Sequence, residues 1–490
     1  MFKYNKKLLA HFRNPKNHGR MKNPDGVGRE GNPKCGDVME MYIKVKNERI
    51  SDIKFLTFGC LPPNEEILVN EGSWKAIAEV GNGWNVLNSK GIQTKVLGTS
   101  IRKYKGPILT LIPFVSSFNK FSVTSEHPIL AIKRKWVRLA SKSSKICQWL
   151  KIKEEELFKV RPKYVLAENL DIGDYLVFVP STQVKDSPKF TNELVRLIGY
   201  YLAEGYSSSN SSVLCFAFNK KEKNYIQEVK SLLYKITGKN PKQRLRKSVI
   251  EIYICSRKWV SFFRSTAGSL AFRKKLSQEI MLLPFKKQWE LLETYIRGDG
   301  NIYRRRINNF PTFRVATASK QLVIQIQEML ARGNIFSSIK KYSNVKTRSY
   351  IEGRKITAKP LYEISFRLSR KHKFVHSNGR YFLVPIKKID KKEYFGNVHN
   401  IQIAGKPNSY LVKGFAVHNC VAAIGISSIL TETIKGKTIE EAKKITTKEL
   451  LKEVGEIPPV KYHCSVLGIQ SLSRAIKDYE RKKLNKNKKC

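Results

Sequence analysis

The sequence before residue 60 reads on directly after residue 419, and this break constrains the fold more than any other feature. Joined as Gly59–Cys420, the flanks give FLTFGCVAAIGISSILTETIKGK, in which a strand-like segment runs into a helix. The 59-residue and 71-residue flanks are each too small for a comfortable hydrophobic core. We therefore predict that residues 1–59 and 420–490 fold together as one α+β domain, with an antiparallel sheet and helices, around a 360-residue insert.

The flanks also show the local patterns of that domain. Before the insert, we expect a helix from Lys6 to Phe12 and two strands, at 41–45 and 52–58. After the insert, we expect a helix from Val421, a second from Thr438, a break at the Pro-Pro pair and a long terminal helix.

A set of metal-ligating side chains gathers around the junction. PKCGD supplies Cys35 and Asp37, the junction supplies Cys420, and PPVKYHCS supplies His463 and Cys464. Three thiols, one imidazole and one carboxylate form a soft, mixed set that suits an iron–sulfur cluster or zinc. The alternative is that these are unrelated core cysteines, which is a fair reading of any one of them.

With GNPKCGD, TFGC and PPVKYHCS in these places, the joined flanks resemble the U-type (NifU/IscU-like) iron–sulfur cluster assembly scaffolds. The resemblance implies that the five residues hold an iron–sulfur cluster or zinc, that the scaffold itself is not an enzyme, and that a cysteine desulfurase is a partner. It also implies that IPPVK (457–461) docks an Hsp70-type chaperone, although Ile457 replaces the usual leucine.

The residues at the two ends of the insert have a chemistry of their own. Cys60 can attack the preceding carbonyl and convert the Gly59–Cys60 amide into a thioester. Cys420 can then attack that thioester, and Asn419, which follows His418, can cut the 419–420 bond through its side-chain amide. A final sulfur-to-nitrogen shift leaves an ordinary Gly59–Cys420 peptide bond, and no cofactor is needed.

FSVTSEHPIL adds Thr124 and His127, spaced so that they could polarise the scissile amide and protonate its nitrogen. Together with the boundary residues, this resembles the intein splicing family, whose splicing domain is an all-β horseshoe (Hint fold). Residues 60–74, 169–180 and 397–419 are similar to its opening, middle and closing blocks. Asn400 stands where many members carry aspartate.

The middle of the insert contains a weak duplication, in which LIGYYLAEG (197–205) recurs 95 residues later as LETYIRGDG (292–300). We expect two α/β halves around a pseudo-twofold axis, with glycines that let the two helices approach closely and bring Glu204 and Asp299 together. Two such carboxylates are suited to Mg²⁺ and to metal-assisted phosphodiester hydrolysis. For either motif alone, a helix end capped by acid–glycine is the simpler interpretation.

The pair resembles the LAGLIDADG homing endonucleases, which implies site-specific double-strand cleavage of DNA, with the uninterrupted host gene as target. Basic segments at 304–319 and 361–370 are then expected to line the major groove. Two positions depart from the family pattern: Glu204 replaces an aspartate, and Arg297 replaces the acid at the sixth position of the second motif. A splicing-competent insert with a degenerate nuclease is therefore an open alternative.

These interpretations divide the insert into a first splicing part (60–180), the endonuclease (181–385) and a second splicing part (386–419). The net charge of +52 is spread along the chain and decides nothing by itself. A basic nucleic-acid-binding protein with structural zinc is a rival, but it predicts CxxC pairs, and the eight cysteines include none. No apolar run reaches the length of a membrane span and no secretory signal is visible, so we expect a soluble, cytoplasmic protein.

Overall fold

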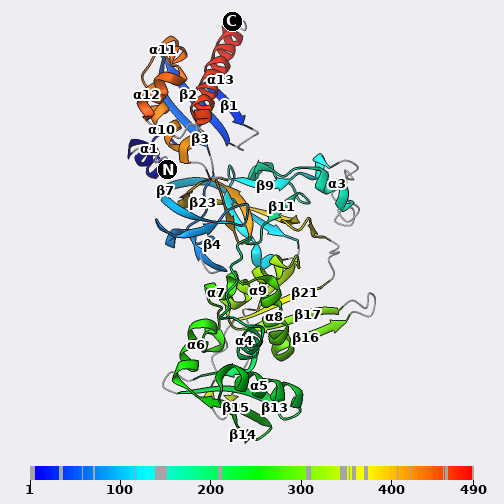
Figure 1. Ribbon diagram of the computed structural model, residues 1–490. Coiled ribbons are helices and arrows are strands. Elements are labelled where there is room, and N and C mark those ends of the chain that lie inside the picture. Colours follow the sequence, from blue (N-terminus) through cyan, green and yellow to red (C-terminus); the bar gives the residue numbers. More distant parts are fainter. Residues whose placement is uncertain are drawn as a thin grey trace.

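The computed structural model describes most of the chain, and its parts lie one after another along a single long axis (Figure 1). Residues from both termini form one end, a large sheet forms the middle, and an α/β part forms the other end. The described residues are 6–32, 37–57, 59–69, 72–114, 116–137, 152–207, 212–304, 311–342, 350–351, 354–355, 360–368, 374–405, 407–419, 421–455, 457 and 462–487.

The two flanks form one domain, as predicted. A three-stranded antiparallel sheet of β1 (Gly26–Asn32), β2 (Asp37–Lys46) and β3 (Arg49–Thr57) packs against α10 (Val421–Ile434) and α13 (Tyr462–Asn487), and α1 (Lys6–Arg13) packs on α10. One hydrophobic core draws its side chains from both flanks, including Leu8, Phe55, Leu430 and Ile476. The 360 residues between the flanks in sequence therefore do not separate them in space.

Two details of this domain differ from the sequence expectations. The segment after Thr438 forms two short helices, α11 (Ile439–Lys444) and α12 (Thr447–Val454), because a second capping box at Thr446 and Glu449 starts a new helix. Strand β1 was not expected, since its glycines argue against a strand. A Cβ at Gly26 or Gly28 would overlap the backbone of α13, so these glycines permit a close approach of strand and helix.

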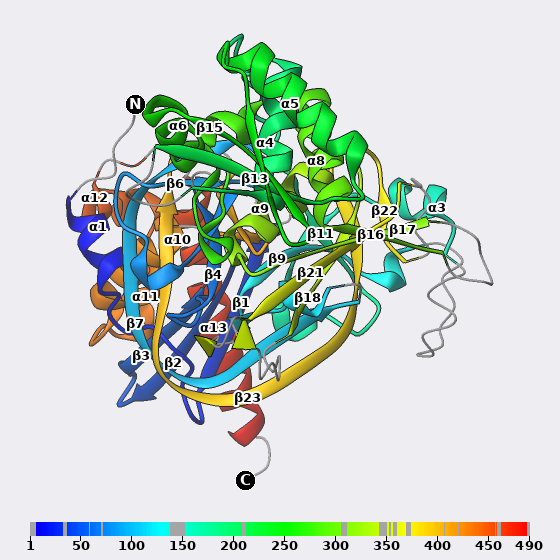
Figure 2. The same cartoon turned by 90° about the horizontal axis from the view of Figure 1, so that it is seen from below.

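The middle of the molecule is a 12-stranded sheet dominated by two long, curved partners, β7 (Gln93–Pro113) and β23 (Phe382–Ile403), which Figure 2 shows side by side. The α-helix described in this part is the short α3 (Glu154–Lys159), and four single turns of 3-10 helix accompany the strands. The remaining strands are β4 (Glu66–Val69), β5 (Ser73–Ala76), β6 (Asn85–Leu87), β8 (Phe121–Thr124), β9 (Pro128–Ile132), β10 (Lys163–Leu166), β11 (Tyr175–Phe178), β22 (His376–Ser377), β24 (Ser409–Val412) and β25 (Phe415–His418).

The α/β part leaves and re-enters this sheet at adjacent positions. Phe178, the last residue of β11, pairs with Phe382, the first residue of β23. Strand β23 thus begins shortly before the expected boundary at 385/386, and its first residues already belong to the large sheet. The α/β part is therefore an insertion within the insert, and the strands that precede and follow it are hydrogen-bonded neighbours in the large sheet.

The α/β part is built from two similar halves. In each half, a helix, two strands, a second helix and two further strands follow one another, and the four strands are ordered first, second, fourth, third. This agrees with the duplication expected from the sequence. The first half comprises α4 (Asn192–Glu204), β12 (Gly205–Tyr206), β13 (Val213–Asn219), α5 (Lys223–Thr237), β14 (Lys242–Arg246), β15 (Val249–Cys255) and α6 (Arg257–Ala267). After α7 (Gln278–Leu282), the second comprises α8 (Phe285–Asp299), β16 (Gly300–Arg304), β17 (Pro311–Thr317), α9 (Lys320–Arg332), β18 (Ser337–Tyr342), the small pair β19 (Tyr350–Ile351) and β20 (Arg354–Lys355), and β21 (Leu361–Phe366).

Within the described ranges, no helix combines the length and the apolar character that crossing a membrane requires.

Candidate active sites

The Gly59–Cys60 peptide bond lies between the end of β8 and the last residues of β23. The Cys60 N–H donates to Thr124 Oγ1 (2.9 Å), and the Thr124 N–H donates to the Cys60 carbonyl (3.0 Å). Leu61 and His399 exchange two further backbone hydrogen bonds, of 2.8 and 2.7 Å. The scissile amide nitrogen is thus fixed directly against the threonine hydroxyl that the sequence singled out.

The carbonyl side of the same bond is held by Asn400. Its Nδ2 donates to the Gly59 oxygen (3.2 Å), while its Oδ1 accepts from the Ile401 N–H (2.9 Å) and the Tyr410 hydroxyl (3.4 Å). The two donors on Oδ1 leave Nδ2 as the group that faces Gly59. A donor on this carbonyl stabilises the negative charge that develops when a nucleophile attacks it. From the sequence, Asn400 was only a departure from the family pattern.

His127 packs against the other face of Gly59. A Cβ at Gly59 would overlap the His127 backbone, which explains why a glycine precedes the junction. Burial, followed by the nearby His418 and Arg102, lowers the pKa of His127 to about 3, while a hydrogen bond with the Gly59 backbone opposes this shift. The ring is therefore neutral at physiological pH. A neutral imidazole at this position can exchange a proton with the Gly59–Cys60 peptide group.

Asn419 and His418 come to the same place at the end of β25, which pairs with β9 directly after His127. The Asn419 side chain is buried, and within the described part of the chain neither its oxygen nor its nitrogen has a hydrogen-bond partner. Its backbone N–H donates to the Asn408 carbonyl (2.8 Å) and fixes the main chain. The His418 ring lies edge-on to Tyr164, with centroids 4.7 Å apart. Cys420 lies outside the described residues.

A buried ion pair that the sequence did not reveal stands beside Cys60. Arg102 Nη2 lies 2.8 Å from Glu126 Oε1, and both side chains are at most one-tenth exposed. Burial raises the pKa of the Cys60 thiol, whereas Arg102 lowers it and Glu126 raises it. Arg102 therefore favours the thiolate that a nucleophilic cysteine requires. Glu126 lies within TSEH, but Arg102 comes from β7, and no local motif marks it.

Only part of the expected metal set falls within the described residues. Cys464 is buried, and its Sγ lies 3.4 Å from His463 Nε2. Asp37 opens β2, whereas Cys35, like Cys420, lies outside the described ranges. Among the side chains that are described, no three His, Cys, Asp or Glu residues group together as a metal site. The five-residue ligand set therefore stays a prediction.

The two duplicated helices, α4 and α8, meet at their glycines. A Cβ at Gly199 would overlap Thr294, and Gly298 faces Ala203 and Glu204 in the same way. Across the seam, Thr294 Oγ1 donates to the Arg196 carbonyl (3.0 Å). The close approach agrees with the role expected for these glycines.

Glu204, which is half-buried, and Asp299, whose side chain reaches the surface, end these two helices. Burial, with Asp299 second, raises the pKa of Glu204 to about 7, and burial raises that of Asp299 to about 6. Lys274, which the sequence did not single out, lowers both; burial lowers its own pKa to about 7. Its Nζ donates to the Gly205 carbonyl (2.7 Å) and to that of Tyr201. Two neighbouring carboxylates with raised pKa values form an oxygen donor set that fits a divalent cation such as Mg²⁺.

The described residues of the basic segments that we expect to contact DNA lie in or next to the four-stranded sheet of the second half of the α/β part. Arg314 of β17 stacks over Tyr303 (5.0 Å), and Arg367 Nε donates to Thr312 Oγ1 (3.0 Å). Residues 305–310 and 369–370 of these segments lie outside the described ranges.

Two protein-family models match parts of this chain. The NifU-like N terminal domain matches residues 3–62 and 400–486, on both sides of the insert. The LAGLIDADG-like domain matches residues 286–368, which begin at α8 and include the second half of the α/β part.

Several curated proteins are similar to this chain. An iron–sulfur cluster assembly SufBD family protein of Mycobacterium tuberculosis is 31% identical over 77% of this chain and 44% of its own length. The ATP-dependent DNA helicase Hel308 of Thermococcus kodakarensis is 24% identical over 74% of this chain and 36% of its own length. The iron–sulfur cluster assembly scaffold protein IscU 1 of Archaeoglobus fulgidus is 60% identical over 57 residues, which are 12% of this chain and 37% of that protein. This chain thus spans less than half the length of each of these three relatives.

Solved structures of homing endonucleases also align with the chain. I-DmoI in complex with DNA and Mn is 14% identical and covers 36% of this chain and 90% of its own, with a TM-score of 0.26. I-WcaI bound to its DNA recognition sequence is 14% identical and covers 47% and 86%, with a TM-score of 0.26. From the family matches on both sides of the insert and inside it, this chain contains a NifU-like N-terminal domain that is interrupted by an insert carrying a LAGLIDADG-like domain.

Proposed function

We propose that residues 60–419 excise themselves by protein splicing and join Gly59 to Cys420. The observation that carries this proposal is the setting of the Gly59–Cys60 bond, whose carbonyl accepts from Asn400 and whose nitrogen donates to Thr124. These are the two atoms that change charge when an amide becomes a thioester. The sheet around them, with its long curved strands β7 and β23, supports a Hint-type splicing domain.

The first step is an acyl shift at Cys60. The Cys60 sulfur bonds to the Gly59 carbonyl carbon, and the bond from that carbon to the Cys60 nitrogen breaks. Asn400 stabilises the charge on the oxygen, and Arg102 favours the thiolate. The neutral His127 ring is placed to accept the proton that the Cys60 thiol loses and to pass it to the departing nitrogen. The product is a thioester between residues 59 and 60 with a free amino group at Cys60.

The later steps transfer and release the flanks. The Cys420 sulfur attacks the thioester and takes over residues 1–59, which frees the Cys60 thiol. The Asn419 side-chain nitrogen then bonds to its own backbone carbonyl carbon, and the 419–420 bond breaks, with His418 next to it as proton donor. The freed Cys420 nitrogen attacks the new thioester, and a normal peptide bond forms.

The names of the relatives give independent support. Residues outside 60–419 make up only about a quarter of the chain, so matches over 77% and 74% of it must run through most of the insert. One of these relatives is named as a SufBD family protein and the other as a DNA helicase. Similar segments in proteins with unrelated names are what we expect of an insert that has entered different hosts.

The spliced product is then an iron–sulfur cluster assembly scaffold of about 130 residues. It is proposed to receive iron and sulfur, the latter from a cysteine desulfurase, and to pass the cluster on, with an Hsp70-type chaperone as a further partner. Cys464 and His463 lie together at the start of α13, on the domain that both flanks build. Cys420 would act first as a splicing nucleophile and afterwards as a cluster ligand.

Expression of the wild-type chain should yield two smaller products, of about 130 and 360 residues, instead of a single 56.4 kDa chain. The measurement is a denaturing gel with mass spectrometry of the product that contains the Gly59–Cys420 bond. A double variant, Cys60→Ala with Asn419→Ala, serves as the control and should stay at 56.4 kDa. A wild-type chain that persists at full length after purification and incubation would contradict splicing.

A second activity is favoured by the seam of α4 and α8: we infer a Mg²⁺-dependent DNA endonuclease. Glu204 and Asp299 would hold the metal ion, which when bound would stabilise charge on a scissile phosphate. Lys274 compensates the two carboxylates in the absence of the ion.

Because the pKa values of Glu204 and Asp299 are raised to about 7 and about 6, protons compete with the metal at mildly acidic pH. Mg²⁺ affinity should therefore rise as the pH increases from 6 to 8, measured by calorimetry on the splicing-locked double variant. Cleavage of a duplex with the host coding sequence joined across codons 59 and 420 should follow the same trend. Asp299→Asn should abolish both, whereas Glu279→Gln, an exposed acid paired with Lys189, should change neither. Mg²⁺ affinity that does not vary with pH would contradict the assignment.

A further inference from the structure

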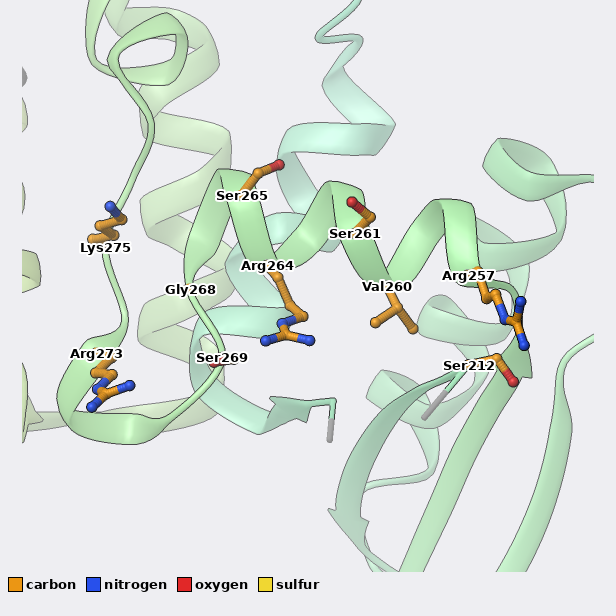
Figure 3. A pocket seen from close by; sticks show the side chains of 10 residues that line it. All are labelled: Ser212, Arg257, Val260, Ser261, Arg264, Ser265, Gly268, Ser269, Arg273 and Lys275. Atoms are coloured by element: carbon orange, nitrogen blue, oxygen red, sulfur yellow. The ribbon is translucent and has the colours of Figure 1, made fainter. Parts of the chain in front are cut away.

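A pocket of about 760 Å³ lies between α6 and the segment that follows it, in the first half of the α/β part (Figure 3). Figure 3 shows Arg257 at one end, Arg273 and Lys275 at the other, and Arg264 between them. The other residues that line it are mostly serines. The pocket is separate from the seam that carries Glu204 and Asp299.

The charge of this pocket has one sign. Four of its ten lining residues are Arg or Lys, and none is acidic. Arg257, Arg273 and Lys275 are exposed, and none of these three pairs with an acid among the residues that the structure describes. Like charges gathered in one hollow repel each other, so the arrangement favours binding of an anion. Serine hydroxyls add hydrogen-bond donors that phosphate oxygens accept.

The segment 268–275 connects the pocket with the seam of α4 and α8, because its residues contact both. Lys274 is buried, and its Nζ reaches the carbonyls of Tyr201 and Gly205, at the end of α4. Its neighbours Arg273 and Lys275 are exposed and line the pocket. The Tyr201 hydroxyl also donates to the Gly268 carbonyl (2.9 Å). Within this one segment, Lys274 thus points toward the carboxylates of the seam, whereas its neighbours Arg273 and Lys275 line the pocket.

The spread of the cations indicates what kind of anion fits. Helix α6 has 11 residues, which corresponds to a length of about 16 Å, and its cations extend from one end of it to the segment beyond the other. One strand of duplex DNA carries a phosphate about every 3.4 Å along the axis. A row of three or four phosphates therefore matches the pocket better than a single small anion.

We propose that this pocket binds the phosphate backbone of duplex DNA outside the cleavage seam, as a sequence-independent contact. The proposal rests on the endonuclease function inferred above and adds a second DNA contact to it. Phosphate contacts of this kind hold the protein on the duplex without reading its sequence. The pocket would thus bring any duplex close to Lys274 and the two carboxylates. The strands that carry the basic segments 304–319 and 361–370 would then read its sequence.

The test uses the full-length, splicing-locked double variant and fluorescence anisotropy with two duplexes in EDTA. One duplex carries the host sequence joined across codons 59 and 420, and the other has a random sequence. In this background, Arg257→Gln, Arg273→Gln and Lys275→Gln are combined. Removing one phosphate-binding cation reduces the slope of log affinity against log salt by about 0.9, so the slope of the triple variant should be smaller by about 2.7 on both duplexes. Affinity at low salt should fall at least roughly tenfold, equally for both.

The matched control replaces three exposed lysines of the scaffold domain, Lys46, Lys448 and Lys452, by glutamine. It removes the same charge and should leave the slope unchanged. Thermal unfolding checks the fold, and the triple variant should be at least as stable as its parent because like-charge repulsion is removed. Equal slopes for the triple variant and the control would overturn the pocket proposal. If the triple variant keeps the parent's slope but alone loses binding of inorganic phosphate, measured by calorimetry, the site belongs to a small anion instead. If the parent binds no DNA at any salt concentration, the endonuclease function itself fails.

Discussion

Replacing Asn419 by alanine should stop the release of residues 420–490 and still allow the thioester to form at Cys60. Alanine has no side-chain amide, so the 419–420 bond can no longer be cut by cyclisation. The contacts at the other end of the insert, from Asn400 to Gly59 and from Cys60 to Thr124, do not involve this side chain. Added dithiothreitol should therefore release residues 1–59 from the variant, and a denaturing gel should show no product of about 130 residues.

A matched control for this variant is Asn82→Ala, which removes the amide of an exposed turn residue in the same domain. It should splice like the wild type. Formation of the ligated product by Asn419→Ala at the wild-type level would exclude the proposed release step. Complete resistance to thiol would instead place a further role for Asn419 in the first step, contrary to the separation that the contacts indicate.

The residues that carry the covalent steps could be predicted from the sequence because covalent chemistry ties a residue type to a position. Only a nucleophile can stand at residue 60, and only a residue with a side-chain amide can cyclise at residue 419. In the structure these residues, Cys60, Thr124, His127, His418 and Asn419, are buried, Thr124 contacts Cys60 and His418 lies near His127, while their roles in splicing stay predictions. Cys420 lies outside the described residues, and its role stays a prediction.

The residues that tune this chemistry could not be found in the same way. Arg102 reaches Cys60 because the long pairing of β7 with β23 sets Arg102 opposite Val398, next to the β23 residues that contact residues 59–61. Lys274 acts on Glu204 and Asp299 from a segment between the two halves, far from either motif. Such contacts depend on long-range strand and helix packing, which leaves no fixed spacing in the sequence.

Some parts of the fold could likewise be predicted from the sequence, and others could not. The duplicated helices and the shared domain of the two flanks follow from repeated motifs and from hydrophobic patterns that are local. Strand β1 was missed because Gly26 and Gly28 are poor strand formers that are present for their close contact with α13. The long curved strands were also not expected, since a strand of 21 or 22 residues that is partly exposed shows no single hydrophobic pattern.

The role of Asn400 gives the second large effect. If its amide stabilises the oxyanion at Gly59, Asn400→Ala should slow thioester formation by a factor on the order of 10²–10³, the usual effect of removing one such donor. The step can be isolated in the Asn419→Ala background by the rate of thiol-induced release of residues 1–59. Circular dichroism and unchanged DNA binding would show that the variant is folded.

Asn400→Asp tests whether Asn400 acts as a hydrogen-bond donor to Gly59 or only as a polar residue at this position. An ionised aspartate can only accept hydrogen bonds, and the Ile401 N–H and the Tyr410 hydroxyl already donate to this position. Only a protonated carboxyl can donate to the Gly59 carbonyl, so the rate of the aspartate variant relative to Asn400 should fall as the pH rises. The amide of Asn400 does not titrate, and ionisation of Cys60 affects both proteins alike, which makes the ratio the informative quantity. A ratio that is constant from pH 6 to 8, or an alanine variant within twofold of its parent, would show that the contact at Gly59 is structural and that the electrophile is activated from the nitrogen side, by Thr124 and His127.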